Sequence, residues 1–230
     1  MEIYNGRKVP AQEIYDAYNT FILSQDKDVF FKLLQRYELF QKIRNLNGDI
    51  VECGVFKGTG MMVWLKFLIF HSPHDIRRVI GFDFFEKNFV DKLPEHDREM
   101  MSKVFSRVTN LEETDISVEG IKERFTKAEI PCDKFELVKG NVVETCQEYV
   151  KNRPGFRISL LYMDLDLEEP TYAVLSSFWD KIVKGGVIVF DEYGYHVWSE
   201  SNAVDRFIKE KGLFLQKTGV KSPTAYIVKS

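Results

Sequence analysis

The chain has 230 residues, a length within the range of a single α/β domain. Hydrophobic residues make up 44% of the chain and charged residues 29%, a globular composition that excludes a disordered or collagen-like protein. The formal net charge is −3 and no basic run is present, so nucleic acid is not an expected partner. The longest apolar runs, Met61–Leu65 and Phe67–Phe70, are too short to cross a membrane, and the first residues do not read as a signal peptide.

The three cysteines, Cys53, Cys132 and Cys146, have spacings that match neither a C-x-x-C motif nor a zinc ligand set. Cys53 and Cys146 have apolar neighbours, which favours free cysteines that pack as small hydrophobic side chains over a catalytic thiol. This cysteine usage is typical of a reducing compartment, and the cytoplasm is the expected location.

The first part of the chain is expected to form helices. Apolar residues recur every three or four positions within Ala11–Gln25 and again from Val29 to Ile43, and no glycine or proline interrupts this stretch. The sequence therefore predicts a helical cap over residues 1–47. The cap is also a candidate surface for homo-oligomer formation.

From Gly48 onward, short apolar runs alternate with helical patterns, which predicts a doubly wound α/β sheet. The predicted strands are Ile50–Cys53, Val79–Phe82, Phe135–Val138, Ile158–Met163, Val187–Phe190, Leu213–Gln216 and Ala225–Val228. The predicted helices are Gly60–Phe70, Ser117–Lys127, Val143–Lys151, Thr171–Ile182 and Asn202–Lys211. The turn Thr218–Pro223 leaves no room for a crossover helix, so the last two strands are expected to form an antiparallel edge hairpin. Residues 48–230 thus form a mostly parallel, seven-stranded Rossmann-like core within one domain.

One polar segment, Glu86–Asp115, interrupts the alternation after the second of these strands. An insertion beyond the carboxyl end of a strand is well placed to serve as a lid or substrate loop. A solvated surface excursion is the alternative interpretation.

The loop after the first strand of the core carries the pattern E-x-G-x-x-x-G-x-G, from Glu52 to Gly60. This differs from the G-x-G-x-x-G loop that holds the pyrophosphate of a dinucleotide. Gly54 and Gly58 allow close backbone approach, and Glu52 offers an acid to a cationic group, which suits S-adenosylmethionine. Lys57 and Thr59 belong to the same predicted cofactor loop, although a tight turn without a ligand is the alternative.

The next two strand ends continue the predicted cofactor site. Asp83 ends the strand Val79–Phe82 and could accept hydrogen bonds from both ribose hydroxyls, with Phe84 beside it; a helix cap is the alternative. Asn141 follows Gly140 after the third strand and could border the adenine, although Gly-Asn is also a common turn.

Four acidic residues follow two further strands. Asp164 and Asp166 come after Ile158–Met163, and Asp191 and Glu192 come after Val187–Phe190. Adjacent strands bring these carboxylates together, and crowded carboxylates favour a hard cation such as Mg²⁺, with Mn²⁺ or Ca²⁺ as alternatives. Glu168 and Glu169 are expected only to cap the next helix.

In combination, these motifs resemble the macrocin O-methyltransferase (TylF) family. The resemblance runs from about Tyr37 to Phe207 and is carried by the segments 48–58, 81–83, 164–171 and 185–194. It implies a class I S-adenosylmethionine-dependent fold, Mg²⁺, and methylation of sugar hydroxyls on glycosylated molecules. It further implies that Asp164, Asp191 and Glu192 bind the metal, that Asp166 is the general base, and that Asp164 also borders the cofactor.

The expected function is therefore a metal-assisted O-methyltransferase acting on a hydroxyl of a sugar or glycosylated small molecule. His196 is a second candidate for the base, although a loop histidine is more often a surface residue. A methyltransferase for catechol-like phenols and a non-catalytic S-adenosylmethionine-binding protein are the alternatives. A nicotinamide-dependent oxidoreductase is disfavoured because its phosphate-binding loop is missing.

Overall fold

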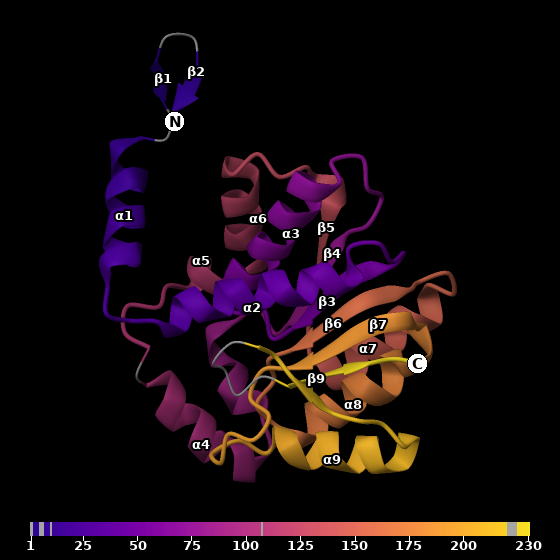
Figure 1. Ribbon diagram of the computed structural model, residues 1–230. Coiled ribbons are helices and arrows are strands. Elements are labelled where there is room, and N and C mark those ends of the chain that lie inside the picture. Colours follow the sequence, from indigo (N-terminus) through magenta and orange to yellow (C-terminus); the bar gives the residue numbers. More distant parts are fainter. Residues whose placement is uncertain (1, 5–6, 10, 107, 220–224) are drawn as a thin grey trace.

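A seven-stranded sheet forms the centre of the computed structural model, which describes all residues except 1, 5–6, 10, 107 and 220–224 (Figure 1). Its strands are β3 (Asp49–Cys53), β4 (Val79–Asp83), β5 (Phe135–Lys139), β6 (Ile158–Met163), β7 (Ile182–Phe190), β8 (Gln216–Lys217) and β9 (Ala225–Val228). Their order in the sheet is β5-β4-β3-β6-β7-β9-β8. Strands β3 to β7 are parallel and β8 and β9 pair antiparallel at one edge, which confirms the predicted fold class.

The chain reverses its direction of growth between β3 and β6, which are hydrogen-bonded neighbours. From β3 it builds outward through β4 and β5, and then returns to add β6 and β7 on the other side. Such a switch point opens a crevice at the carboxyl ends of the strands, where ligands of doubly wound sheets bind.

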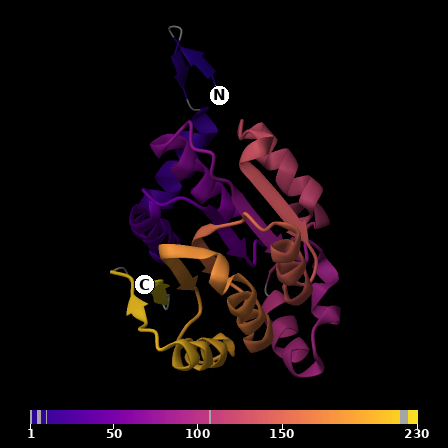
Figure 2. The ribbon, with the colours of Figure 1, turned by 90° about the vertical axis from the view of Figure 1, so that its right-hand side faces the viewer.

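Helices cover both faces of the sheet (Figure 2). One face packs against α2 (Asp28–Ile43), α3 (Thr59–His71) and α6 (Val118–Lys127), and the other against α7 (Val142–Asn152), α8 (Glu168–Phe178) and α9 (Glu200–Lys211). Alternate residues of β3 serve the two cores, with Ile50 on the first face and Val51 on the second. Cys53 and Cys146 are buried in the second core, as expected of small apolar side chains.

The amino-terminal region differs from the predicted helical cap. Its first residues form a hairpin of β1 (Glu2–Tyr4) and β2 (Arg7–Val9), and α1 (Gln12–Leu23) buries none of its residues. The Asn5-Gly6 pair between the strands is a strong hairpin signal that the helical interpretation overlooked. In Figure 1, α1 stands away from the body, so only α2 packs on the sheet.

Two other boundaries also differ from the predictions. Helix α8 begins at Glu168, so Glu168 and Glu169 lie in its first turn, where acidic residues favour the helix dipole. Strand β8 covers Gln216–Lys217 instead of Leu213–Gln216, because Leu213 and Leu215 pack against the core by their side chains. The turn Thr218–Pro223 lies partly outside the described residues.

The insertion after β4 is mostly helical. It contains the 3-10 turn η1 (Lys87–Lys92) and the helices α4 (Glu95–Phe105) and α5 (Glu113–Ile116). Two further 3-10 turns lie elsewhere in the chain: η2 (Cys132–Lys134) and η3 (Trp179–Lys181). In both views α4 lies at the same end of the molecule as α9 (Figures 1 and 2). Within the described part of the chain, the helices are too short or too polar for a transmembrane segment.

A buried ion pair fixes α2 to the sheet. Arg36 of α2 donates to Glu52 of β3 over 3.1 Å, and the indole N–H of Trp64 donates to the same carboxylate over 2.7 Å. The Arg36 guanidinium also lies 4.1 Å from the ring centroid of Tyr162. Removing one partner of a buried pair leaves an uncompensated charge, which costs several kcal/mol.

Gly60 makes room for this pair, and its replacement is expected to destabilise the fold. A Cβ atom at Gly60 would lie 2.1 Å from a Glu52 carboxylate oxygen and 2.7 Å from Arg36 Nη2. Although alanine is intrinsically better in a helix by ~1 kcal/mol, we expect Gly60→Ala to lower the free energy of unfolding by ~1–3 kcal/mol. Urea denaturation measures this, with Gly155→Ala as the control because nothing lies within 4 Å of its Cβ position. Equal stability of the two variants would contradict the expectation.

Candidate active site

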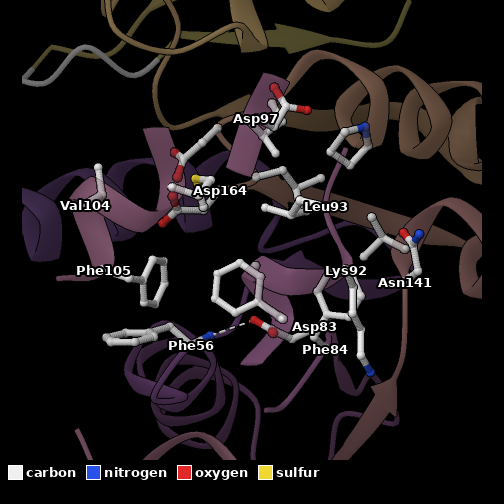
Figure 3. Close-up of a pocket in the computed structure, with 18 of the residues that line it drawn as sticks. Phe56, Asp83, Phe84, Lys92, Leu93, Asp97, Val104, Phe105, Asn141 and Asp164 are labelled. Carbon is white, nitrogen blue, oxygen red and sulfur yellow. Dashed lines mark hydrogen bonds between the residues drawn. The ribbon is translucent and has the colours of Figure 1, made fainter. Parts of the chain in front are cut away.

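A cavity of about 350 Å³ opens at the carboxyl ends of β3, β4 and β6, a size typical of small-molecule sites. Gly54, Asp83, Asn141 and Asp164 line it from four strand ends (Figure 3). With Phe84, which also lines the cavity, five of the predicted cofactor residues meet around one space.

Gly54 allows two strand ends to approach each other closely. Its φ is +87°, and a Cβ atom there would lie 1.9 Å from the main-chain oxygen of Asp164. Only glycine satisfies both the left-handed conformation and this contact. Gly54 was predicted to let a ligand approach the backbone closely. Its close contact in the structure is with the end of β6, and Gly54 also lines the cavity.

Asp83 ties the glycine loop to β4. Its Oδ2 accepts from the backbone N–H groups of Val55 (2.7 Å) and Phe56 (2.9 Å), and its Oδ1 accepts from Phe85 N–H (3.1 Å). A carboxylate has about four acceptor sites, and three are used here, so about one remains for a ribose hydroxyl. Asp83 is therefore not a conventional helix cap; it organises the loop and also lines the cavity.

Phe84 and Asn141 lie at the cavity wall with local contacts of their own. Phe84 stacks on Phe89 at 5.8 Å between ring centroids. Asn141 caps α7, since its side chain accepts from Val143 N–H over 3.1 Å. The two interpretations of the Gly-Asn pair are compatible, because a helix-capping turn also borders the cavity.

The other predicted cofactor residues do not line the cavity. Glu52 is buried in its contacts with Arg36 and Trp64, and burial raises the pKa of its carboxyl group. Lys57 lies 3.7 Å from Asp115, Gly58 packs against α6, and Thr59 is exposed at the start of α3. The geometry gives Glu52 a structural role, and its long-range partners were not apparent in the motif.

The insertion supplies an apolar wall that its polar sequence did not suggest. Its cavity-lining residues are Glu86, Phe89, Lys92, Leu93, Pro94, Asp97, Met101, Val104, Phe105 and Val108. Phe105 packs edge-on against both Phe56 (6.1 Å) and Phe89 (4.7 Å), which joins the insertion to the glycine loop. Lys92, the lysine among these cavity-lining residues, forms an ion pair with Glu86. The insertion thus lies where a lid would be.

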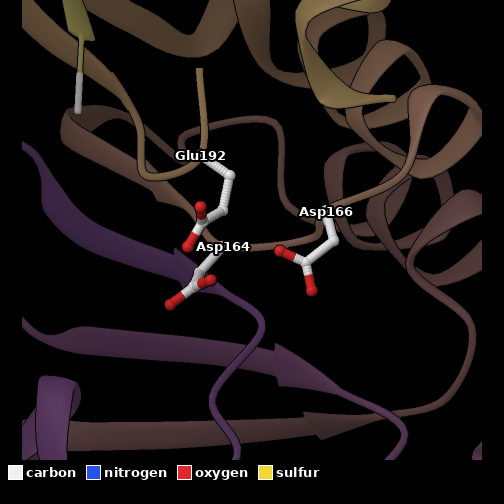
Figure 4. A group of neighbouring side chains, drawn as sticks. All are labelled: Asp164, Asp166 and Glu192. Carbon is white, nitrogen blue, oxygen red and sulfur yellow. The ribbon is translucent and has the colours of Figure 1, made fainter. Parts of the chain in front are cut away.

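Three carboxylates gather beside the cavity. One oxygen each of Asp164, Asp166 and Glu192 lie within 4.8 Å of one another, and Figure 4 shows the three side chains directed toward a common space. Asp164 and Asp166 also line the cavity. The predicted meeting of the β6 and β7 ends is therefore observed for these three residues.

Burial and mutual repulsion raise the pKa values of all three groups. Burial is the largest cause for each. The charges of Glu192 and Asp191 add to it at Asp166, whose pKa is raised to about 7. The pKa of Asp164 is raised well above its ordinary value by burial and by Asp191. Oxygen donors with such pKa values fit a hard divalent cation, because its charge would relieve the repulsion.

Asp191, predicted as a metal ligand, is not in this group. It is buried, and its oxygens accept from Lys32 Nζ (2.7 Å) and from the Tyr162 hydroxyl. Lys32 comes from α2, one helical turn before Arg36, and half of its side chain is exposed. Neither Lys32 nor Tyr162 was predicted from the sequence; the spacing of Lys32 and Arg36 by one helical turn in α2 was the available signal.

Asp166 reaches the group through an irregular backbone. Strand β6 ends at Met163, and Asp166 has a φ of +65°, a left-handed conformation that is uncommon for residues other than glycine. Simple strand alternation therefore does not place Asp166 beside Asp164; a sharp turn does. Such strained positions are common at functional sites.

His196 lies in the exposed loop after β7 and is neither a cavity-lining residue nor part of the carboxylate group. Its ring contacts Tyr195 at 5.5 Å between centroids. The geometry favours the surface interpretation of this histidine.

The strand order and the site at the switch point define a class I methyltransferase fold. The sequence profile of the macrocin-O-methyltransferase (TylF) family matches residues 34–226, and the chain belongs to this family. It is an S-adenosylmethionine-dependent O-methyltransferase, which confirms the resemblance found in the sequence. A search of curated proteins found no match to the sequence.

Solved structures show the same fold at low sequence identity. CalS11, a calicheamicin methyltransferase, is 24% identical with a TM-score of 0.71, and the match covers 96% of this chain and 86% of CalS11. The O-methyltransferase NovP is 20% identical with a TM-score of 0.71, covering 87% and 80%. An O-methyltransferase from Bacillus cereus in complex with S-adenosylhomocysteine is 13% identical with a TM-score of 0.54, covering 95% and 90%.

Proposed function

We propose that the protein transfers the methyl group of S-adenosylmethionine to a hydroxyl of a sugar or glycosylated small molecule, with the help of a divalent cation. One observation carries this proposal: Asp164 and Asp166 belong both to the cavity wall and to the group of three carboxylates. Cofactor and cation would therefore lie side by side. CalS11 is described as a TDP-rhamnose 3'-O-methyltransferase, which supports a sugar acceptor.

The chain's own residues account for the steps of such a transfer. Asp83 would hold the ribose and Asn141 would border the adenine, while Asp164 and Glu192 would hold the cation. When bound, the cation lowers the pKa of a coordinated acceptor hydroxyl. Asp166 would receive the hydroxyl proton as the oxygen–carbon bond forms and the carbon–sulfur bond breaks, which is the role of a general base.

The apolar insertion would exclude water from the reacting groups. Phe89, Phe105 and Met101 cover the cavity beside the glycine loop. Exclusion of water strengthens the electrostatic interactions inside a site. We therefore propose residues 86–115 as a lid. The three free cysteines support the proposed reducing, cytoplasmic setting.

Calorimetric titration with S-adenosylhomocysteine, followed by methyl-transfer assays on glycosides and catechols, tests the function. We expect cofactor binding with or without EDTA, transfer to glycosides over catechols, loss of transfer in EDTA and recovery in Mg²⁺. Failure to bind S-adenosylhomocysteine would contradict the whole proposal. Full transfer in EDTA would contradict only the role of the cation, and a preference for catechols would contradict the sugar acceptor.

The Asp166→Asn variant distinguishes between two roles of Asp166, general base and metal ligand. Asparagine tolerates the left-handed backbone of Asp166 but cannot accept the proton. We expect turnover to fall ~10²–10⁴-fold, the usual contribution of a positioned base, with little change in the Kd for Mn²⁺ measured by calorimetry. Asp164→Asn is the comparison and should weaken Mn²⁺ binding. Recovery of Asp166→Asn in excess Mg²⁺ would make Asp166 a ligand instead.

We also propose that the N-terminal helices associate with those of a second copy. Large apolar side chains are exposed along α1 and the first ten residues of α2: Ile14, Tyr15, Tyr18, Ile22, Leu23, Val29, Phe30, Leu33, Leu34 and Tyr37. Helix α1 has 12 residues and buries none of them. Isolated helices of about this length are marginal in water, so packing against a partner would stabilise α1. A second copy offers the same apolar surface for a two-fold interface.

Sedimentation velocity tests this association. We expect a dimer or larger species for the natural protein and a shift to monomer for the double variant Ile14→Glu/Tyr18→Glu, because two charges would interrupt the apolar surface. Asn19→Glu, an added charge at an exposed polar position of the same helix, is the control and should remain associated. A monomeric natural protein at high micromolar concentration would refute the proposal.

A further inference from the structure

The first turn of α9 contacts both loops that carry the carboxylates. Glu200 Oε2 accepts from the backbone N–H of Glu192 over 2.9 Å, and the backbone N–H of Glu200 donates to the main-chain oxygen of Asp166 over 3.0 Å. One residue therefore bonds to the backbone of the β6 loop and the backbone of the β7 loop at once.

The two serines beside Glu200 each bond to the backbone of one of these loops. Ser199 Oγ accepts from Glu168 N–H over 2.9 Å, on the side of the β6 loop. Ser201 Oγ accepts from Gly194 N–H over 2.9 Å, on the side of the β7 loop. The turn from Ser199 to Ser201 thus links the two loops by hydrogen bonds that involve neither a carboxylate of the group nor the cavity.

Glu200 is a costly residue at this position. It is fully buried, and within the described part of the chain its Oε1 has no hydrogen-bond partner. A buried, unsatisfied oxygen near other acids lowers stability. Among the described residues, the hydrogen bond that Glu200 Oε2 accepts from the Glu192 backbone is the side-chain contact that offsets this cost.

We propose that Glu200 is a positioning residue that sets the distance between Glu192 and Asp166 by holding the backbones of both loops. Neither loop has regular structure at these positions, since β6 ends at Met163 and β7 at Phe190. Without Glu200, repulsion among the carboxylates would let the loops separate. The inference rests on the proposed cation site and adds a residue that contacts neither the cation nor the cofactor cavity.

Binding of Mn²⁺ and of S-adenosylhomocysteine, each measured by calorimetry on the full chain, tests this role. We expect Glu200→Ala to weaken Mn²⁺ binding ~10–100-fold, the usual effect of losing a partner that orients a metal ligand, with the Kd for S-adenosylhomocysteine changed less than about threefold. Glu200→Gln keeps an oxygen that accepts from Glu192 N–H, and should restore Mn²⁺ binding to near the natural value. A general loss of structure would not produce this split or this rescue.

Glu210→Ala is the matched control, because Glu210 lies on the exposed part of the same helix and bonds to Tyr172 and Arg206. It should bind both ligands normally. If Glu200→Ala does not fold, Ser199→Ala and Ser201→Ala remove the neighbouring links and should each weaken Mn²⁺ binding measurably while leaving S-adenosylhomocysteine binding intact. Natural Mn²⁺ affinity in the folded Glu200→Ala variant, or in both serine variants, would overturn the inference. A natural protein that binds no Mn²⁺ would overturn it together with the cation site.

Discussion

Repulsion among half-buried carboxylates at one edge of the sheet is the constraint around which this site is built. Asp164, Asp166 and Glu192 offer oxygens within 4.8 Å of one another, and Asp191 and Glu200 lie close enough for their charges to act on them. Two full charges ~5 Å apart at an effective dielectric constant of 20 repel by roughly 3 kcal/mol. The group persists only if protons, cations or hydrogen bonds offset this repulsion, and the raised pKa of Asp166 reflects it.

The compensating groups come from elements far away in the sequence. Helix α2 supplies Lys32 to Asp191 and Arg36 to Glu52, so the helix that covers one face of the sheet also brings positive charge to its carboxyl edge. Helix α9 supplies Glu200 and the serines on the other side of the loops. Tyr162, on β6, connects the Arg36–Glu52 pair with the Lys32–Asp191 pair, because it contacts the Arg36 guanidinium and donates to Asp191. The carboxylate edge is thus held from both faces of the sheet.

This arrangement explains which features could be predicted from the sequence. Buried parallel strands leave continuous apolar runs, and ligands gather at their carboxyl ends, so the sheet, Gly54, Asp83 and the meeting of Asp164 with Glu192 followed from local patterns. Partners across the fold leave no such pattern. Glu52 and Asp191 look like free acids in their motifs, yet Arg36 and Lys32 pair with them across 16 and 159 positions of the chain. The left-handed turn at Asp166 and the apolar wall inside a polar insertion likewise depend on tertiary contacts.

The same electrostatics link the cofactor to the cation in the proposed reaction. S-adenosylmethionine carries a positive sulfonium and a positive ammonium, and Asp164 faces both the cavity and the carboxylate group. Each positive charge that binds would offset part of the repulsion among the carboxylates. The apolar residues of the insertion would limit the screening of these charges by water. Loss of the methyl group turns the sulfonium into a neutral thioether, which removes one of these charges. In the proposed reaction, the carboxylate edge would therefore hold the reactant form of the cofactor more strongly than the product form, a difference that would favour release after transfer.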